Sequence, residues 1–160
     1  MKPNLNIQVS EDTEICVVGD IHEHDIQFLK LIEKLEPNSK KIVVSVGDLK
    51  DKGFGYVSFK KIFNKIQSLS QEGLCYFVNG NHELKYFRRA QRNNNWDDDF
   101  RWLARQPLAL SFLWPNQRRL TVLHGGVLPS WTWNDIETNS YISAINKNMS
   151  GNKIAYIKEI

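Results

Sequence analysis

The hydrophobic pattern predicts two buried strands that end in the same dipeptide. Apolar runs at 15–18 and 41–46 are each followed by Gly-Asp. Between them, apolar residues recur at helical spacing over 26–36, where Asp25 is the expected N-cap. A strand, a helix and a second strand in succession predict parallel neighbours, with functional loops at the carboxyl ends of the strands.

The rest of the chain continues this alternation. The further predicted elements are helices over 57–69, 83–92 and 97–105, a strand over 74–78, and a hairpin of strands over 108–114 and 118–123. The tail is less regular, with a helix expected over 135–149 and either a helix or a strand over 154–160. Because no repeat or linker interrupts the pattern, a single α/β domain over 1–160 is expected, which some schemes would class as α+β.

Composition and charge exclude several classes of protein. A hydrophobic fraction of 41% and a charged fraction of 24% argue against disordered, collagen-like and coiled-coil chains. The net charge of +3, from 21 basic and 18 acidic residues, does not indicate nucleic-acid binding, although it leaves that partner open. The first residues lack the apolar core of a signal peptide, and no apolar run approaches the roughly 18 residues of a membrane span. We therefore expect a cytoplasmic protein without a membrane partner.

Side chains that can bind metals follow four of the predicted strands. In chain order they are Asp20, His22, Asp48, Asn81, His82 and His124. Carboxylate, amide and imidazole groups are ligands that hard and borderline divalent metals favour. A single Asp or His at a strand end is usually structural. Four such loops in succession predict one shared site.

These side chains lie in four motifs whose order resembles the signature of the calcineurin-like metallophosphoesterases. The motifs are GDIHEH at 19–24, GDLKDKG at 47–53, GNHE at 80–83 and HGG at 124–126. The most similar branch contains the Ser/Thr protein phosphatases and the symmetrical bis(5'-nucleosyl)-tetraphosphatases. Segments of the tetraphosphatases also resemble WLARQPL at 102–108 and HGGVLPSW at 124–131. The resemblance implies a β-sheet sandwich flanked by helices.

The resemblance also implies two divalent metal ions, with Mn²⁺, Fe or Zn²⁺ as the candidates. Asp20 and His22 would bind one ion, Asp48 would bridge both, and Asn81 and His124 would bind the second. A hydroxide shared between the ions would be the nucleophile. The implied activity is hydrolysis of phosphate esters or anhydrides. Its substrate would be a phosphorylated small molecule, a dinucleoside polyphosphate or a phosphoprotein.

Further residues of the motifs match groups that move protons or bind phosphate in the family. His82 matches the catalytic histidine that protonates the leaving group, and Asp51 would orient it. Lys52 stands where many relatives carry arginine and would contact phosphate without a bidentate fork. Arg88 and Arg89 belong to a basic stripe on the helix after GNHE, which is either a second phosphate contact or a solvated face.

One part of the family pattern is missing from this chain. The resemblance implies a further histidine ligand to the second metal, downstream of HGG, but the last histidine is His124. Three explanations stay open: a C-terminally truncated chain that lacks part of the second sheet, a minimal variant in which another group replaces the ligand, and a degenerate domain. A degenerate domain would leave the second site weak or empty and act as a non-catalytic binding module. Missing strands would also expose apolar edges and favour oligomers.

Overall fold

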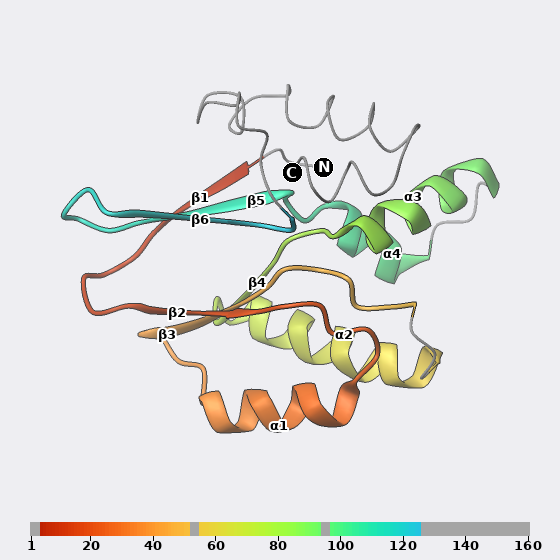
Figure 1. The fold of residues 1–160 in the computed structure, drawn as a ribbon, viewed down its shortest axis with the longest axis horizontal. Coiled ribbons are helices and arrows are strands. Elements are labelled where there is room, and N and C mark those ends of the chain that lie inside the picture. Colours follow the sequence, from red (N-terminus) through yellow and green to blue (C-terminus); the bar gives the residue numbers. More distant parts are fainter. Residues whose placement is uncertain (1–3, 52–54, 94–96, 126–160) are drawn as a thin grey trace.

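Two three-stranded sheets form the centre of the molecule and lie face to face (Figure 1). The computed structural model describes residues 4–51, 55–93 and 97–125. The first sheet contains, in spatial order, the parallel strands β2 (Glu14–Val18), β3 (Lys41–Ser45) and β4 (Cys75–Phe77). In the second sheet, β5 (Ala109–Leu113) is parallel to β1 (Asn4–Gln8) and antiparallel to β6 (Arg119–Leu123). The predicted parallel pair and the predicted hairpin are both confirmed.

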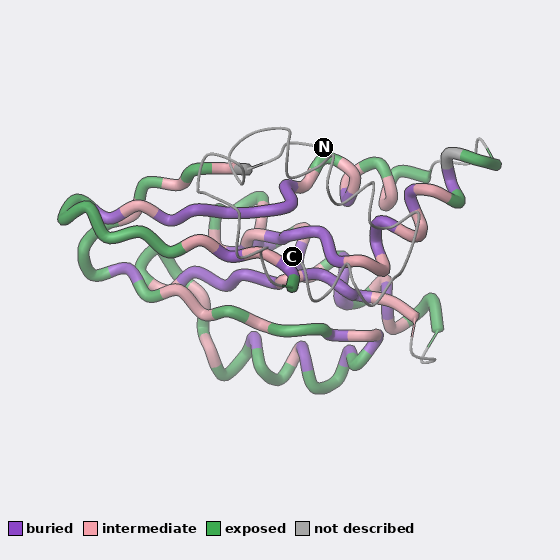
Figure 2. The backbone as a smooth tube through the Cα atoms, turned by 45° about the horizontal axis from the view of Figure 1, so that its top comes forward, coloured by how far each residue is buried: buried purple, intermediate pink, exposed green. Residues whose placement is uncertain are grey.

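The central strand β3 is buried on both faces, as its continuous apolar run predicts. Val43 packs into the core beneath the helices, whereas Ile42 and Val44 pack into the core shared with the second sheet. This division follows from the two-residue period of a strand, which sends successive side chains to opposite faces. Figure 2 shows the resulting buried interior of the sheets and the exposed outer faces of the helices.

Four helices surround the sheets. The helices α1 (Asp25–Leu35) and α2 (Tyr56–Gln71) cover the outer face of the first sheet, and α3 (Asn81–Asn93) and α4 (Asp98–Ala104) lie at the end where β4 leads into α3 (Figure 1). Phe59, Ile62 and Phe63 bring the buried side of α2 into the core. Among the helices of the described residues, none is long and apolar enough to cross a membrane.

The structure corrects two of the predicted helix starts. Asp25 is not the N-cap of α1: it lies in the first turn, where its carboxylate pairs with Lys61 Nζ at 2.9 Å. His24 occupies the cap position and makes no side-chain capping bond. The helix α3 begins at Asn81 rather than at Glu83, so Asn81 and His82 belong to a helical turn instead of a preceding loop. Two candidate site residues are therefore held by helical hydrogen bonding.

The strand β1 was not predicted. Its sequence, NLNIQ, offers only Leu5 and Ile7 as apolar residues, and both pack against the core between the sheets. Two alternating apolar residues give a weak strand signal, and the parallel pairing with β5 joins segments about a hundred residues apart. The predictions for 135–149 and 154–160 lie outside the described residues.

Candidate active site

The carboxyl ends of β2, β3 and β4 meet the end of β6 at one edge of the molecule. A cleft of about 360 Å³ opens there, and its lining residues are Asp20, His22, Val46, Asp48, Asn81, His82, His124 and Gly125. Parallel strands place their carboxyl ends at a common edge, which explains why three of the motifs converge. The second sheet contributes the fourth motif through β6. The structure thus brings all six sequence-predicted metal-binding and acid side chains together.

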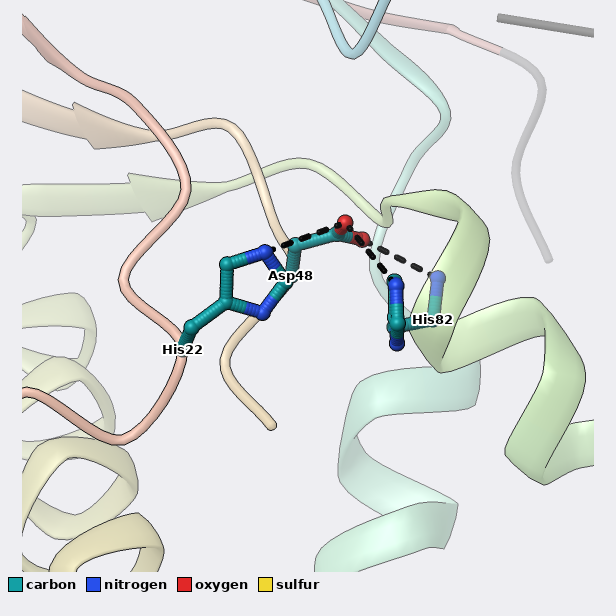
Figure 3. A group of neighbouring side chains, drawn as sticks. All are labelled: His22, Asp48 and His82. Carbon is teal, nitrogen blue, oxygen red and sulfur yellow. Dashed lines mark hydrogen bonds and ion pairs between the residues drawn. The ribbon is translucent and has the colours of Figure 1, made fainter. Parts of the chain in front are cut away.

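Asp48 lies at the centre of this cleft. Its Oδ2 atom is 3.9 Å from His22 Nε2 and 3.7 Å from His82 Nε2, while its Oδ1 atom is 3.8 Å from His124 Nε2. Only 4% of the Asp48 side chain is exposed. Figure 3 shows His22 and His82 approaching the carboxylate from the loop after β2 and from the first turn of α3. The two carboxylate oxygens therefore face different imidazoles, as a bridging ligand requires.

Asp20 and Asn81 complete the surroundings of these imidazoles. The Asp20 carboxylate lies 3.6 Å from His22 Nε2 through one oxygen and 3.8 Å from His124 Nδ1 through the other. Asn81 Oδ1 lies 3.0 Å from His124 Nε2. The predicted pairs, Asp20 with His22 and Asn81 with His124, are thus adjacent.

Two groups of ligand atoms are compact enough to hold a metal ion. One contains His22, Asp48 and His82, the other contains Asp20, Asp48 and His124, and within each the ligand atoms lie within 4.8 Å of one another. Asp48 belongs to both groups, in agreement with the predicted bridge. Both groups differ from the predicted sets. The first includes His82, which the sequence assigned to proton transfer, and the second includes Asp20, which the sequence assigned to the same ion as His22.

Backbone carbonyls fix the orientation of two of the imidazoles. His22 Nδ1 lies 3.1 Å from the carbonyl oxygen of Lys50, and His124 Nδ1 lies 2.7 Å from that of Val46. A carbonyl only accepts, so Nδ1 donates the proton and the lone pair remains on Nε2, the nitrogen that faces Asp48. Histidines that bind metals usually have this arrangement. The donor set therefore fits divalent metal ions.

His82 has a carboxylate partner instead of a carbonyl. Its Nδ1 atom lies 3.1 Å from Asp51 Oδ2, which also accepts from Lys85 Nζ, and the Tyr86 hydroxyl donates to Asp51 Oδ1. Burial acts to raise the pKa of Asp51, but the hydrogen bonds from Lys85, Tyr86 and His82 outweigh it and hold that pKa well below its usual range. Burial and the hydrogen bond to Asp51 raise the pKa of Tyr86, which keeps its hydroxyl a donor. Tyr86 was not among the predicted site residues.

Glu83 is a second residue of the site that was not predicted. Its side chain is buried and accepts three backbone N–H groups, from Asp48 at 2.8 Å, Leu49 at 2.9 Å and Gly80 at 2.9 Å. Burial, and then the charge of Asp48, raise the pKa of Glu83. This carboxylate ties the loop after β3 to the start of α3. Its place in GNHE was the only signal in the sequence.

Three site residues have backbone conformations that are unusual for residues with a side chain. The φ angles are 43° at His22, 52° at Asp48 and 95° at Asp51. Residues other than glycine rarely adopt positive φ, and such strain persists where surrounding contacts determine the conformation. Here those contacts are the hydrogen bonds of the site itself.

Gly80 leaves no room for a side chain, which allows a test of how tightly the site is packed. A Cβ atom at this position would lie 2.2 Å from Asp48 Oδ1. Gly80→Ala is expected to displace the carboxylate and to lower the free energy of unfolding by about 2–3 kcal/mol, measured in urea. Gly19→Ala is the matched control, since a Cβ there meets nothing within 4 Å. Equal stability of the two variants would contradict this packing.

Two of the predicted phosphate contacts do not line the cleft. Arg88 is half-buried and Arg89 is exposed, with its guanidinium carbon 6.0 Å from the centroid of the Tyr86 ring, and neither lines the cleft. Lys52 lies outside the described residues. Their contact with phosphate stays a prediction.

Comparisons with known proteins support the fold and identify the family. The structure is similar to that of a protein described as a diadenosine tetraphosphatase (TM-score 0.59, 24% identity), with coverage of 79% of this chain and 58% of the other. It is also similar to a serine/threonine phosphatase from Saccharomyces cerevisiae that resembles human phosphatase PP5 (TM-score 0.57, 23% identity), with coverage of 82% and 46%. The chain thus spans about half the length of these proteins. These likenesses confirm the predicted α/β sandwich with flanking helices.

No curated protein matches the sequence. The family profile described as calcineurin-like phosphoesterase matches residues 13–153, which is most of the chain and includes all four motifs. This chain therefore belongs to the calcineurin-like phosphoesterase family.

Proposed function

We propose that the chain is a metal-dependent hydrolase of phosphate esters or anhydrides. The observation that carries the proposal is the geometry of Asp48, whose two oxygens face different imidazoles in one cleft. Membership of the calcineurin-like phosphoesterase family supports the same reaction class. A buried carboxylate that lies near three imidazoles is suited to act as a ligand shared by two metal ions.

Asp20, His22 and Asp48 would hold one divalent ion, and Asp48, Asn81 and His124 would hold the second. Ions bound there, with Mn²⁺, Fe and Zn²⁺ as the candidates, would activate water for attack on phosphorus and offset phosphate charge. The carbonyls of Lys50 and Val46 keep two imidazoles in the tautomer that such binding needs. The second set contains the uncharged amide of Asn81, whereas the first set contains the second carboxylate, Asp20. We therefore expect the second ion to bind more weakly than the first.

We assign His82 to proton donation rather than to metal binding. Its Nδ1 atom is hydrogen-bonded to the Asp51 carboxylate, which orients the ring, and its place in GNHE matches the histidine that protonates the leaving group in the family. Its Nε2 atom faces the cleft beside Asp48, where a leaving oxygen would be protonated. In this proposal the two metal-binding histidines are oriented by backbone carbonyls, and the acid histidine is oriented by a carboxylate.

This assignment predicts a dependence on the leaving group. In the Mn²⁺-loaded protein, His82→Ala is expected to lower kcat for phenyl phosphate by about 100-fold, because a general acid contributes at least this much when the leaving group is a strong base. The loss for p-nitrophenyl phosphate should be much smaller, since nitrophenolate leaves without a proton. The measurement is the kcat of each variant for both esters.

His24→Ala is the matched control, because this exposed histidine lies two residues from His22 and does not line the cleft of the site. It should keep the wild-type kcat for both esters. An equal loss on the two esters in His82→Ala would remove the acid role and support metal binding by His82 instead. Wild-type activity on both esters that does not exceed that of Asp48→Asn would favour the alternative function, a non-catalytic binding module.

Two substrate classes stand out for the proposed hydrolase. One similar structure is described as a diadenosine tetraphosphatase and the other as a serine/threonine phosphatase. We therefore propose a dinucleoside polyphosphate or a phosphoprotein as substrate, with other phosphorylated small molecules as further candidates. Hydrolysis of diadenosine tetraphosphate beside a phosphoserine peptide separates them: failure on the dinucleotide alone would remove that class.

A further inference from the structure

Tyr86 holds two consecutive residues of the loop that follows β3. Its hydroxyl donates to Asp51 Oδ1, and Lys50 Nζ lies over its ring, 5.1 Å from the ring centroid. Both neighbours bear on the site, because the Lys50 carbonyl accepts from His22 and the Asp51 carboxylate pairs with His82. One side chain of α3 thus contacts the loop that orients an imidazole on each side of Asp48.

The ring of Tyr86 is itself fixed by packing. Phe100 of α4 stacks on it, with ring centroids 5.6 Å apart and an angle of 29° between the planes. Lys50 extends over the rings of Tyr56 and Phe59 as well, at 5.6 Å and 5.4 Å, so its ammonium group lies among three aromatic rings. Stacking and cation–π contacts of this kind restrict where the Tyr86 hydroxyl can lie.

The donors to Asp51 are divided between its two oxygens. His82 and Lys85 share Oδ2, whereas Tyr86 contacts Oδ1. All three donors come from one face of α3, since they are three and four residues apart. A hydrogen bond to each oxygen prevents the carboxylate from rotating about its Cβ–Cγ bond. The Asp51 backbone, with φ at 95°, needs such restraint to stay in place.

We propose that Tyr86 is a positioning residue that fixes the Asp51 carboxylate and thereby orients the His82 ring toward the leaving group. The proposal rests on the proposed hydrolase function for its catalytic consequence. Its structural part, the orientation of His82 through Asp51, concerns the protein without substrate or metal. The two parts can therefore be tested separately.

Tyr86→Phe removes the hydroxyl and keeps the stacked ring. Its kcat for phenyl phosphate is expected to fall by about 10-fold with KM unchanged, since a misplaced acid slows only the protonation step. The kcat for p-nitrophenyl phosphate should change by less than about 2-fold, because that leaving group needs no acid. Tyr56→Phe is the control: its hydroxyl bonds to Asp99 instead, and its ring contacts the same Lys50.

The second readout is the proton on His82 Nδ1, observed by NMR in the metal-free protein labelled on its four histidines. In the wild type, the bond to Asp51 should protect this proton and give a downfield signal that is missing in His82→Ala. The signal should weaken or shift in Tyr86→Phe and stay unchanged in Tyr56→Phe. This measurement does not depend on enzymatic activity. An inactive wild type would therefore contradict the proposed hydrolase function, but the NMR signal would still test whether Tyr86 orients His82 through Asp51.

A purely structural role for Tyr86 predicts a different pattern. Tyr86→Phe would then match the wild type in both readouts, and only Tyr86→Leu, which removes the stack on Phe100, would lose activity, equally on the two esters. That pattern would overturn the proposal. A signal that changes in Tyr86→Phe, with a loss confined to phenyl phosphate, would support it.

Discussion

Replacement of Asp48 by asparagine is expected to abolish stabilisation of the protein by metal without lowering the stability of the metal-free form. Asn keeps an oxygen that can accept from the backbone N–H of His82, which donates to Asp48 Oδ1 at 3.0 Å. The substitution also removes a buried charge that raises the pKa of Glu83. It also removes the only ligand shared by both groups of metal-binding atoms among the described residues. At a Mn²⁺ concentration 100 times the dissociation constant, binding stabilises the wild type by about 2.7 kcal/mol, and the variant should lose this gain.

The measurement is the shift in Tm on addition of Mn²⁺, for each variant and in the presence of EDTA. Asp12→Asn is the matched control, because this exposed carboxylate pairs with Lys40 outside the cleft and should leave the Mn²⁺ shift unchanged. A Mn²⁺ shift of wild-type size in Asp48→Asn would show that the metal binds elsewhere.

Glu83→Ala is expected to have the largest effect on stability. The substitution leaves the backbone N–H groups of Asp48, Leu49 and Gly80 without a partner in a buried environment. An unsatisfied buried donor costs about 1–3 kcal/mol, so the free energy of unfolding should fall by about 4 kcal/mol, allowing for the buried charge that is also removed. This is a large share of the roughly 5–15 kcal/mol typical of a domain. Urea unfolding of the metal-free protein measures it.

Two further variants test the reason for this loss. Glu83→Gln keeps one accepting oxygen but turns an amide N–H₂ toward a backbone donor, so it should lose about half as much. Glu33→Ala, on the exposed side of α1, should stay within about 0.5 kcal/mol of the wild type. A loss in Glu83→Ala no greater than in Glu33→Ala would mean that these hydrogen bonds do not hold the loops together.

Much of the arrangement follows from local sequence. The apolar run of β3 predicts a strand buried on both faces, and the repeated Gly-Asp ending predicts parallel neighbours with Asp20 and Asp48 at a common edge. The adjacency of His22, Asp48 and His124 follows from the family pattern carried by the four motifs. The strands were predictable because each depends on residues close in sequence, whereas the adjacency of the three side chains, which are far apart in sequence, was predictable only through the resemblance to the family.

Other features depend on contacts between distant segments. Tyr86 looked like part of a helix with a basic stripe, and only the packing of α3 against the loop after β3 brings its hydroxyl to Asp51. Glu83 gave no sign that it accepts three N–H groups from two loops. The strand β1 depends on pairing with β5. Periodicity and motifs do not encode such partners, because they describe one segment at a time.

The most direct test of the central claim is Mn²⁺-dependent hydrolysis of p-nitrophenyl phosphate by EDTA-treated wild-type protein and by Asp48→Asn. We predict that the wild type regains activity on addition of Mn²⁺ and that the variant is slower by about 1,000-fold or more, since metal ions supply several kcal/mol of transition-state stabilisation. Wild-type activity no higher than that of Asp48→Asn would contradict a metal-dependent phosphoesterase in this chain.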